Sequence, residues 1–246
     1  MLARLTELIP ARRSPEWAME SILCNAVEKH KVIDPEIHPE DGPLNPGEVI
    51  AAVADACKGR AVIVTDVGQN QMLAARYSRF AQSRSFISSG GLGTMGFGLP
   101  AAIGAKTGAP QRTVVAFIGD GGLQMTLQEL GTIMQEKTGV KIVLLNNNWL
   151  GNVRMWQELF FKERYSCTRL VNPDFEGIAA AYGIACTAVE TRAELAAALE
   201  RMLADDAPFI LDAHVREESL VFPMVPPGHS VDEIMLNNNE WFEYGD

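Results

Sequence analysis

Two apolar segments, residues 114–118 and 142–145, each end in polar residues that could hold a cofactor. The first is followed by Asp120 between glycines, and the second by the amide of Asn147, 27 residues after Asp120. That spacing leaves room for one helix and a returning strand, so both side chains are expected at the carboxyl edge of one parallel sheet, where α/β proteins bind ligands. Carboxylate, amide and phosphate oxygens suit Mg²⁺, and glycines let backbone N–H groups approach phosphate. The pattern therefore predicts a diphosphate cofactor held through a metal.

The glycine-rich segment 91–96 supports a rival interpretation, because GLGTMG matches GxGxxG, the fingerprint of dinucleotide binding. Asp120 also lies past the following strand, where a ribose-binding acid would be expected. Three features favour a metal–diphosphate site instead. Residues 84–89 make a poor core strand, a ribose acid needs no glycines after it, and the asparagines 146–148 have no role in a dinucleotide site. A third, purely structural interpretation remains, in which Asp120 caps a helix and the asparagines form a turn.

The order of apolar and polar segments predicts the fold class. The chain has 246 residues, of which 47% are hydrophobic, enough for one large domain with additional segments. Strands near 61–66, 86, 114–118, 142–145 and 209–213 alternate with helices at 48–57, 99–106, 125–136, 174–182 and 193–203. Such alternation indicates an α/β, doubly wound, mostly parallel sheet with helices on both faces.

Composition restricts the partners and the compartment. The net charge of −10 argues against nucleic acid and anionic membranes as partners. No apolar run approaches the roughly 20 residues that span a bilayer, and the first residues lack the apolar stretch of a signal peptide. The four cysteines form no CxxC pair, so we expect reduced thiols in a cytoplasmic protein.

Further motifs surround Asp120 and Asn147. They are TDVGQNQM at 65–72, GGLGTMGFGLPAA at 90–102, WQELF at 156–160 and PMVPPG at 223–228. In this order, from about residue 45 to about 236, the series resembles acetohydroxyacid synthase (acetolactate synthase), specifically the C-terminal thiamine-diphosphate-binding domain of its catalytic subunit. The resemblance implies residues 1–44 as a remnant of the preceding middle domain plus a linker, residues 45–222 as the thiamine-diphosphate/Mg-binding domain, and residues 223–246 as a C-terminal tail that could form a lid.

The resemblance implies roles for matching positions. Mg²⁺ would be bound by the side chains of Asp120 and Asn147 and by the main-chain carbonyl of Trp149. Met95 would support the bend of the cofactor and bring its two rings together, and Trp156 would select the second 2-oxoacid. Residues 150–165 and the tail from 223 resemble mobile segments that close over the cofactor. The implied cofactor-binding residues are Val67, Gly68, Gln69, Asn70, Gly93, Met95, Gly119, Gly121, Gly122, Asn147, Gly151 and Asn152.

The chain departs from the family pattern at two of these positions. Asn70 stands where many members have histidine, and Asn152 replaces an apolar methionine with a polar amide. Asn70 can hydrogen-bond a phosphate but cannot carry charge. Both changes bear on activity and substrate choice, and neither alters the metal motif.

The resemblance also implies parts that this sequence lacks. In the family, the glutamate that activates the cofactor lies in a separate N-terminal domain on the partner subunit, and the flavin site lies mainly in the middle domain, so FAD is expected only in a full-length parent. None of Glu129, Glu136 or Glu158 can be given the activating role. We therefore expect a homodimer, or pairing with a chain that carries the missing domains, with a regulatory small subunit as a further partner.

The implied activity is transfer of a two-carbon unit from pyruvate to a second 2-oxoacid in branched-chain amino acid biosynthesis. The chain alone is expected to bind the cofactor weakly and not to turn over. Two alternatives stay open: another thiamine-diphosphate decarboxylase, oxidase or carboligase, and a non-catalytic binding module.

Overall fold

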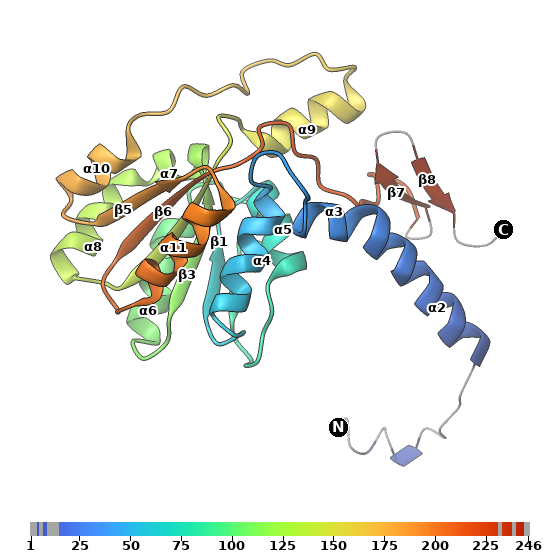
Figure 1. Ribbon diagram of the computed structural model, residues 1–246, viewed down its shortest axis with the longest axis horizontal. Coiled ribbons are helices and arrows are strands. Elements are labelled where there is room, and N and C mark those ends of the chain that lie inside the picture. Colours follow the sequence, from blue (N-terminus) through green and yellow to red (C-terminus); the bar gives the residue numbers. More distant parts are fainter. Residues whose placement is uncertain (1–3, 5–6, 9–14, 231–232, 238–239, 244–246) are drawn as a thin grey trace. The chain divides into compact units, whose positions relative to one another are not determined.

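The computed structural model describes residues 4, 7–8, 15–230, 233–237 and 240–243 (Figure 1). The chain divides into two units. The larger is Glu36–Phe222, and the smaller combines Met1–Pro35 with Pro223–Asp246. The predicted cofactor-binding residues all fall in the larger unit.

The larger unit is built on a six-stranded sheet with the order β2-β1-β3-β4-β6-β5, in which every neighbouring pair is parallel. The predicted parallel α/β sheet is therefore confirmed. Gly119 of β3 pairs with Leu145 of β4, so the residues that follow these two strands meet at one edge. The strands are β1 (Val62–Thr65), β2 (Phe86–Ile87), β3 (Val114–Gly119), β4 (Val140–Asn146), β5 (Ala185–Val189) and β6 (Phe209–His214).

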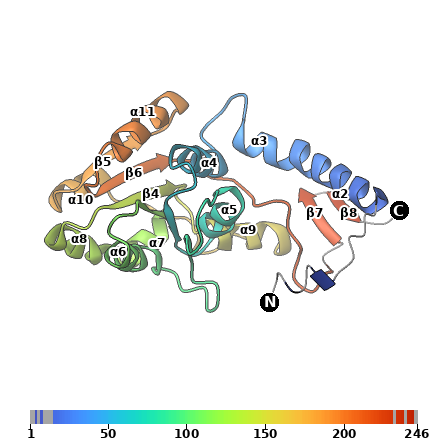
Figure 2. The ribbon, with the colours of Figure 1, turned by 90° about the horizontal axis from the view of Figure 1, so that it is seen from below.

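Helices cover both faces of this sheet, as predicted. Figure 2 shows α4 and α11 along one face and α6, α7 and α8 along the other. The helices of the larger unit are α4 (Pro46–Ala56), α5 (Gln69–Tyr77), α6 (Gly98–Gly108), α7 (Asp120–Met125), α8 (Leu130–Glu136), α9 (Gly151–Phe160), α10 (Phe175–Ala181) and α11 (Arg192–Leu203), with the 3₁₀ helix η2 (Leu127–Glu129) between α7 and α8.

Burial on both faces explains the uninterrupted apolar runs. Val114 and Ala116 of β3 lie in one core cluster with Leu99 of α6 and Ile133 of α8. Their neighbour Phe117 is also fully buried, and successive side chains of a strand point to opposite faces. A strand covered on both faces needs apolar residues at every position.

The predicted helix 125–136 is wrong in its boundaries. The chain turns helical already at Asp120, breaks at Thr126 and resumes through η2 and α8. Thr126 has an extended φ of −133°, and its hydroxyl donates to the carbonyl of Gly96 at 3.1 Å. This side-chain bond to the glycine-rich loop competes with helical geometry at Thr126.

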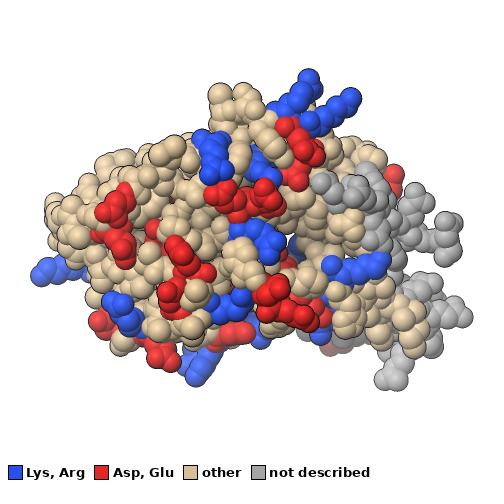
Figure 3. Space-filling view, turned by 45° about the horizontal axis from the view of Figure 1, so that its top comes forward, with Lys and Arg blue, Asp and Glu red and all other residues tan. Residues whose placement is uncertain are grey.

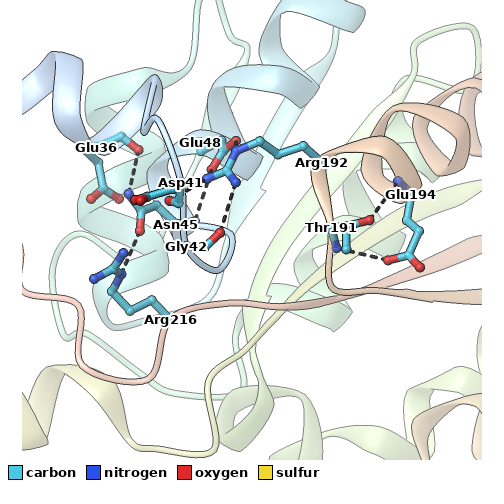
Figure 4. A network of polar contacts seen from close by, with 9 residues as sticks. All are labelled: Glu36, Asp41, Gly42, Asn45, Glu48, Thr191, Arg192, Glu194 and Arg216. Carbon is cyan, nitrogen blue, oxygen red and sulfur yellow. Dashed lines mark hydrogen bonds and ion pairs between the residues drawn. The ribbon is translucent and has the colours of Figure 1, made fainter.

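The segment before α4 is held on the larger unit by two arginines (Figure 4). Arg192 Nη1 donates to the carbonyl of Gly42 at 3.0 Å, and its Nε pairs with Glu48 at 2.6 Å. Arg216 Nε donates to Asn45 Oδ1 at 3.1 Å. A linker is expected from the sequence within residues 1–44, and the structure places the short helix α3 (Asp34–Ile37) in this part of the chain.

The smaller unit contains α2 (Pro15–Glu28), the π-helix η1 (Lys29–Ile33) and an antiparallel pair, β7 (Glu233–Asn237) and β8 (Glu240–Glu243). As predicted, the tail does not join the six-stranded sheet. None of the described helices combines the length and apolarity that crossing a bilayer demands. On the face shown in Figure 3, basic and acidic side chains are interspersed, with no extended basic surface.

Candidate functional site

A cavity of about 250 Å³ lies at the carboxyl edge of β3 and β4. It is lined by every residue to which sequence reasoning gave a metal or cofactor contact. These residues come from four separate stretches of the chain, which only the folded sheet edge brings together. They are Val67, Gly68, Gln69, Asn70, Gly93, Met95, Gly119, Asp120, Gly121, Gly122, Asn147, Trp149, Gly151 and Asn152.

Asp120 is the buried acid of this cavity. It is the first residue of α7 and is only 1% exposed. Its Oδ2 accepts the side-chain N–H of Asn172 at 2.7 Å, and its Oδ1 accepts the amide of Gly121 at 3.1 Å. Burial raises the pKa of Asp120, and the hydrogen bonds from Asn172 and Gly121 oppose that rise. A divalent cation beside this carboxylate would compensate for the cost of burying its charge.

Asn147 supplies the second polar side chain of the predicted metal site and begins the turn that follows β4. Its Oδ1 accepts the backbone N–H of Trp149 at 3.2 Å, and Asn148 between them has a left-handed φ of 59°. Asparagine tolerates that conformation better than most residues. Two backbone bonds brace the turn from the neighbouring loop: Leu150 N to Thr168 O and Leu170 N to Asn148 O, both 2.8 Å.

Two of the glycines at the cavity are required by close packing. A Cβ on Gly122 would lie 2.5 Å from Asp66 Oδ1, and one on Gly151 would lie 2.4 Å from Gln69 Oε1. Gln69 and Gly151 are also the first residues of α5 and α9. The first turn of a helix carries N–H groups without intrahelical partners, which suit a bound phosphate.

Two buried amide oxygens at the cavity have no hydrogen-bond partner among the described residues. They are Oδ1 of Asn70 and Oδ1 of Asn152, the two expected cofactor-binding positions at which the sequence departs from the pattern that it resembles. Buried polar atoms are rarely left unpaired in native proteins. The buried carboxylate, the amide turn and the close-packed glycines fit a metal-bound diphosphate. The two unpaired oxygens are acceptors, so they would pair with a donor group or a cation and not with a phosphate oxygen.

Only one of the two residues implied for catalysis lies at the cavity. Met95 lines the cavity, whereas Trp156 does not. The Trp156 ring instead stacks against Phe160, with ring centroids 4.9 Å apart. Arg154, two residues before Trp156, is only 5% exposed and pairs with Glu158 at 2.8 Å.

Sequence reasoning missed the role of Asp66. This fully buried carboxylate accepts the backbone N–H groups of Val67 at 2.9 Å, Gly96 at 3.1 Å and Gly98 at 2.7 Å. Gly96 closes the GxGxxG segment, and Gly98 begins α6, the helix whose N-terminal amides a dinucleotide site would offer to a diphosphate. Because a buried carboxylate already binds the amides of both glycines, the dinucleotide interpretation loses its support. The sequence did contain a pattern that could have revealed this role, because Asp66 comes directly after strand β1, as Asp120 comes directly after strand β3.

Glu217 is a second residue that sequence reasoning missed. It accepts the side-chain N–H of Asn148 and the indole N–H of Trp149, both at 3.2 Å, and pairs with Arg169 at 2.8 Å. Burial acts to raise its pKa, but the hydrogen bonds from Trp149 and Asn148 and the charge of Arg169 outweigh it and lower the pKa. Glu217 thus holds the outer side of the turn that follows Asn147.

Fold and site together define the larger unit as a cofactor-binding α/β domain whose site lies at the carboxyl edge of a parallel sheet. Comparison with known proteins gives the particular family. Residues 66–213 match the family described as thiamine pyrophosphate enzyme, C-terminal TPP binding domain, and the chain belongs to this family.

Named relatives agree with this assignment. The chain is 46% identical over 199 residues to the acetolactate synthase isozyme 2 large subunit of Escherichia coli, covering 80% of this chain and 36% of that protein. It is 39% identical over 235 residues to the acetolactate synthase large subunit of Lactococcus lactis, covering 95% and 40% respectively. The chain therefore spans well under half the length of these relatives.

A solved structure has the same fold. It is the thiamine diphosphate-dependent 4-hydroxybenzoylformate decarboxylase of Rhodococcus jostii, with a TM-score of 0.67 and 28% identity. The match covers 73% of this chain and 34% of the decarboxylase.

Proposed function

We propose that the cavity binds thiamine diphosphate through Mg²⁺, and that the chain forms the C-terminal part of a thiamine-diphosphate-dependent acetolactate synthase. The observation that carries this proposal is the convergence of the predicted residues, from four stretches of the chain, on one cavity. In this role the side chains of Asp120 and Asn147 and the carbonyl of Trp149 would ligate the metal. Gln69, Asn70 and the cavity glycines would surround the diphosphate.

Thiamine diphosphate, when bound, supplies the electron sink for decarboxylation of a 2-oxoacid. The residues of this chain bind and orient it. Met95, from the glycine-rich loop, would pack under the bend between the two rings. Residues 150–165 would exclude water from the site, since the buried Arg154 side chain lies against the rings of Trp149 and Tyr165, at 5.3 and 5.2 Å from their centroids.

The overall reaction would transfer a two-carbon unit from pyruvate to a second 2-oxoacid, on the route to branched-chain amino acids. The activating glutamate and the FAD site would be supplied by domains outside this chain, through a homodimer of the complete subunit or a partner chain. A small regulatory subunit would be a further partner. We expect the isolated chain to bind the cofactor weakly and not to turn over.

A second candidate is decarboxylation without transfer to a second 2-oxoacid. Its support is that Trp156, the residue implied in selecting the second substrate, does not line the cavity, and that a decarboxylase shares the fold. The test supplies the missing domains as a separate chain, adds pyruvate and 2-oxobutyrate, and identifies the products. A 2-acetyl-2-hydroxy acid supports the synthase, whereas acetaldehyde alone supports the decarboxylase.

A binding test separates both candidates from a non-catalytic module. Thiamine diphosphate is titrated into the full chain with Mg²⁺ and with a chelator. Binding that needs Mg²⁺ is expected, and its absence would favour the module. Titration with NADH in parallel should show no binding.

A further inference from the structure

Asn172 is the hub of a side-chain network beneath the proposed metal site. Its Nδ2 lies 2.7 Å from Asp120 Oδ2, 2.9 Å from Asn146 Oδ1 and 3.2 Å from Asn148 Oδ1. An amide nitrogen carries two hydrogens, so the longest of these contacts shares a donor with another. One amide therefore connects the residue after β3 with the end of β4 and the turn that follows it.

The orientation of this amide is fixed from both sides. A carboxylate oxygen only accepts, so the atom of Asn172 that faces Asp120 must be the nitrogen. On the other side, Gln124 Nε2 donates to Asn172 Oδ1 at 3.0 Å. An amide turned by 180° would set oxygen against oxygen at Asp120 and Asn146, and nitrogen against nitrogen at Gln124.

The backbone delivers Asn172 to this position. Two residues later, Asp174 caps α10 by accepting the amide of Gly177 at 2.9 Å, and Phe175 is buried in the core. Two residues earlier, Leu170 donates its backbone N–H to Asn148 at 2.8 Å. The loop is thus anchored on both sides of Asn172, so the side chain does not depend on a flexible segment.

The network continues into the sheet. Asn146 is 4% exposed, and its Nδ2 donates to the buried Asp212 Oδ1 of β6 at 3.1 Å. Asn146 and Asn172 together connect the carboxyl ends of β3, β4 and β6. An interaction that only closed a loop would not need to reach both a buried carboxylate and the side chains of Asn146 and Asn148.

We propose that Asn172 is a positioning residue for the metal: it fixes the Asp120 carboxylate through Oδ2 and the turn after Asn146 through two amide oxygens. This inference rests on the proposed function. The metal would then meet Asp120 and Asn147 in an arrangement already formed before it binds. Partners that orient metal ligands typically affect metal affinity by about 10–100-fold.

The test compares Asn172→Ala with Asp174→Ala in the full chain. Asp174 lies in the same loop, but its bond to Gly177 serves only the cap of α10, so its loss reports the structural cost alone. Binding of thiamine diphosphate is followed at a fixed concentration while Mg²⁺ is varied. We expect the half-saturating Mg²⁺ concentration to rise about tenfold in Asn172→Ala and to stay within twofold in Asp174→Ala.

A second readout distinguishes positioning from distortion of the cavity. At saturating Mg²⁺ the thiamine diphosphate affinity of Asn172→Ala should return to within about twofold of the unmodified chain. An unchanged Mg²⁺ requirement, or an affinity that saturating Mg²⁺ does not restore, would overturn the proposal. If Asn172→Ala does not fold, Gln124→Met removes the donor that orients the Asn172 amide, and a smaller shift of the Mg²⁺ requirement in the same direction is expected.

If the proposed function is wrong, the binding experiment gives a different result. The unmodified chain would then show no Mg²⁺-dependent binding at all. In that case, crystal structures of the ligand-free chain and of Asn172→Ala decide the inference: the Asp120 side chain should change rotamer in the variant, and an unchanged rotamer would overturn it.

Discussion

Asp66 Oδ2 accepts the backbone N–H of Gly98 at 2.7 Å, although 32 residues separate them in the sequence. The same carboxylate binds the amide of Gly96 through Oδ1, so one buried acid fixes the glycine-rich loop that carries Met95. Gly98 could not be another residue, because a Cβ there would lie 2.9 Å from the backbone nitrogen of Asp66. The loop is therefore held against β1 before any cofactor binds.

Asp66→Ala should strongly destabilise the larger unit. It leaves the buried N–H groups of Gly96 and Gly98 without an acceptor, at about 1–3 kcal/mol each. We expect the free energy of unfolding, measured by urea titration, to fall by about 2–6 kcal/mol. Asp55→Ala removes an exposed carboxylate that pairs with Arg79 at 3.0 Å and should cost less than about 1 kcal/mol. Equal costs for the two variants would contradict the assigned role of Asp66.

Alanine substitutions should distinguish a glycine that has no room for a side chain from a glycine beside open space. In Gly122→Ala the new methyl group would lie 2.5 Å from Asp66 Oδ1, whereas nothing lies within 4 Å of a Cβ on Gly104, which is inside α6. Gly122→Ala should lower the thermal unfolding midpoint and weaken cofactor binding. Gly104→Ala should stabilise the chain by about 0.5–1 kcal/mol, because alanine favours the helix interior. Stabilisation by both variants would refute this packing account.

Glu36 should make stability fall as the pH rises from about 4.5 to about 7. Burial raises the pKa of Glu36 from 4.5 to about 7, although the amide of Gly47 and the charges of Arg216 and Arg76 oppose the rise and Glu48 adds to it. Between pH 4.5 and about 7 the folded chain binds more protons than the unfolded chain, so stability declines across that window.

The matched variant is Glu36→Gln, whose amide oxygen can still accept the N–H of Gly47. It should remove this pH dependence and be more stable than the unmodified chain at pH 8, by about 1–3 kcal/mol. At pH 4 the two proteins should unfold at similar urea concentrations. A constant difference from pH 4 to pH 8 would show that Glu36 does not titrate in this way.

Glu217 should make stability fall as the pH decreases, which is the opposite of the effect expected for Glu36. Its pKa is lowered, despite burial, by the hydrogen bonds of Trp149 and Asn148 and the charge of Arg169. The stability that it contributes is present above its unfolded pKa and is lost as the pH falls through the folded value. Glu217→Gln should therefore lower the unfolding midpoint more at pH 7 than at pH 3. Arg164→Gln serves as a surface control, and its effect should not depend on pH in this range.

The sequence was informative where local pattern decides the structure. The apolar runs before Asp120 and Asn147 could only be buried strands, and their spacing determined that they are parallel neighbours. The break at Thr126 was not predictable, because it depends on a bond to Gly96, 30 residues away. The edge strand β5 was missed because its residues Ala185–Val189 are mostly only partly buried, which leaves a weak apolar signal.

The residues of the candidate site likewise divide into those that the sequence could predict and those that it could not. Residues that belong to motifs, such as Asp120 and Gly151, could be predicted to line one cavity. Asn172 and Glu217 lie in loops outside those motifs and reach the site only through tertiary contacts. No periodicity or spacing marks such residues, so their contribution emerges only from the folded structure.

The central claim is that Asp120 holds a divalent ion that in turn binds a diphosphate. Isothermal titration of thiamine diphosphate into the full chain, with Mg²⁺ or with a chelator, tests it most directly when repeated with Asp120→Ala and the surface control Asp55→Ala. The account predicts binding that requires Mg²⁺ in the unmodified chain and in Asp55→Ala, and loss of that binding in Asp120→Ala. Thiamine diphosphate affinity that is unchanged by Asp120→Ala in the presence of Mg²⁺ would contradict it.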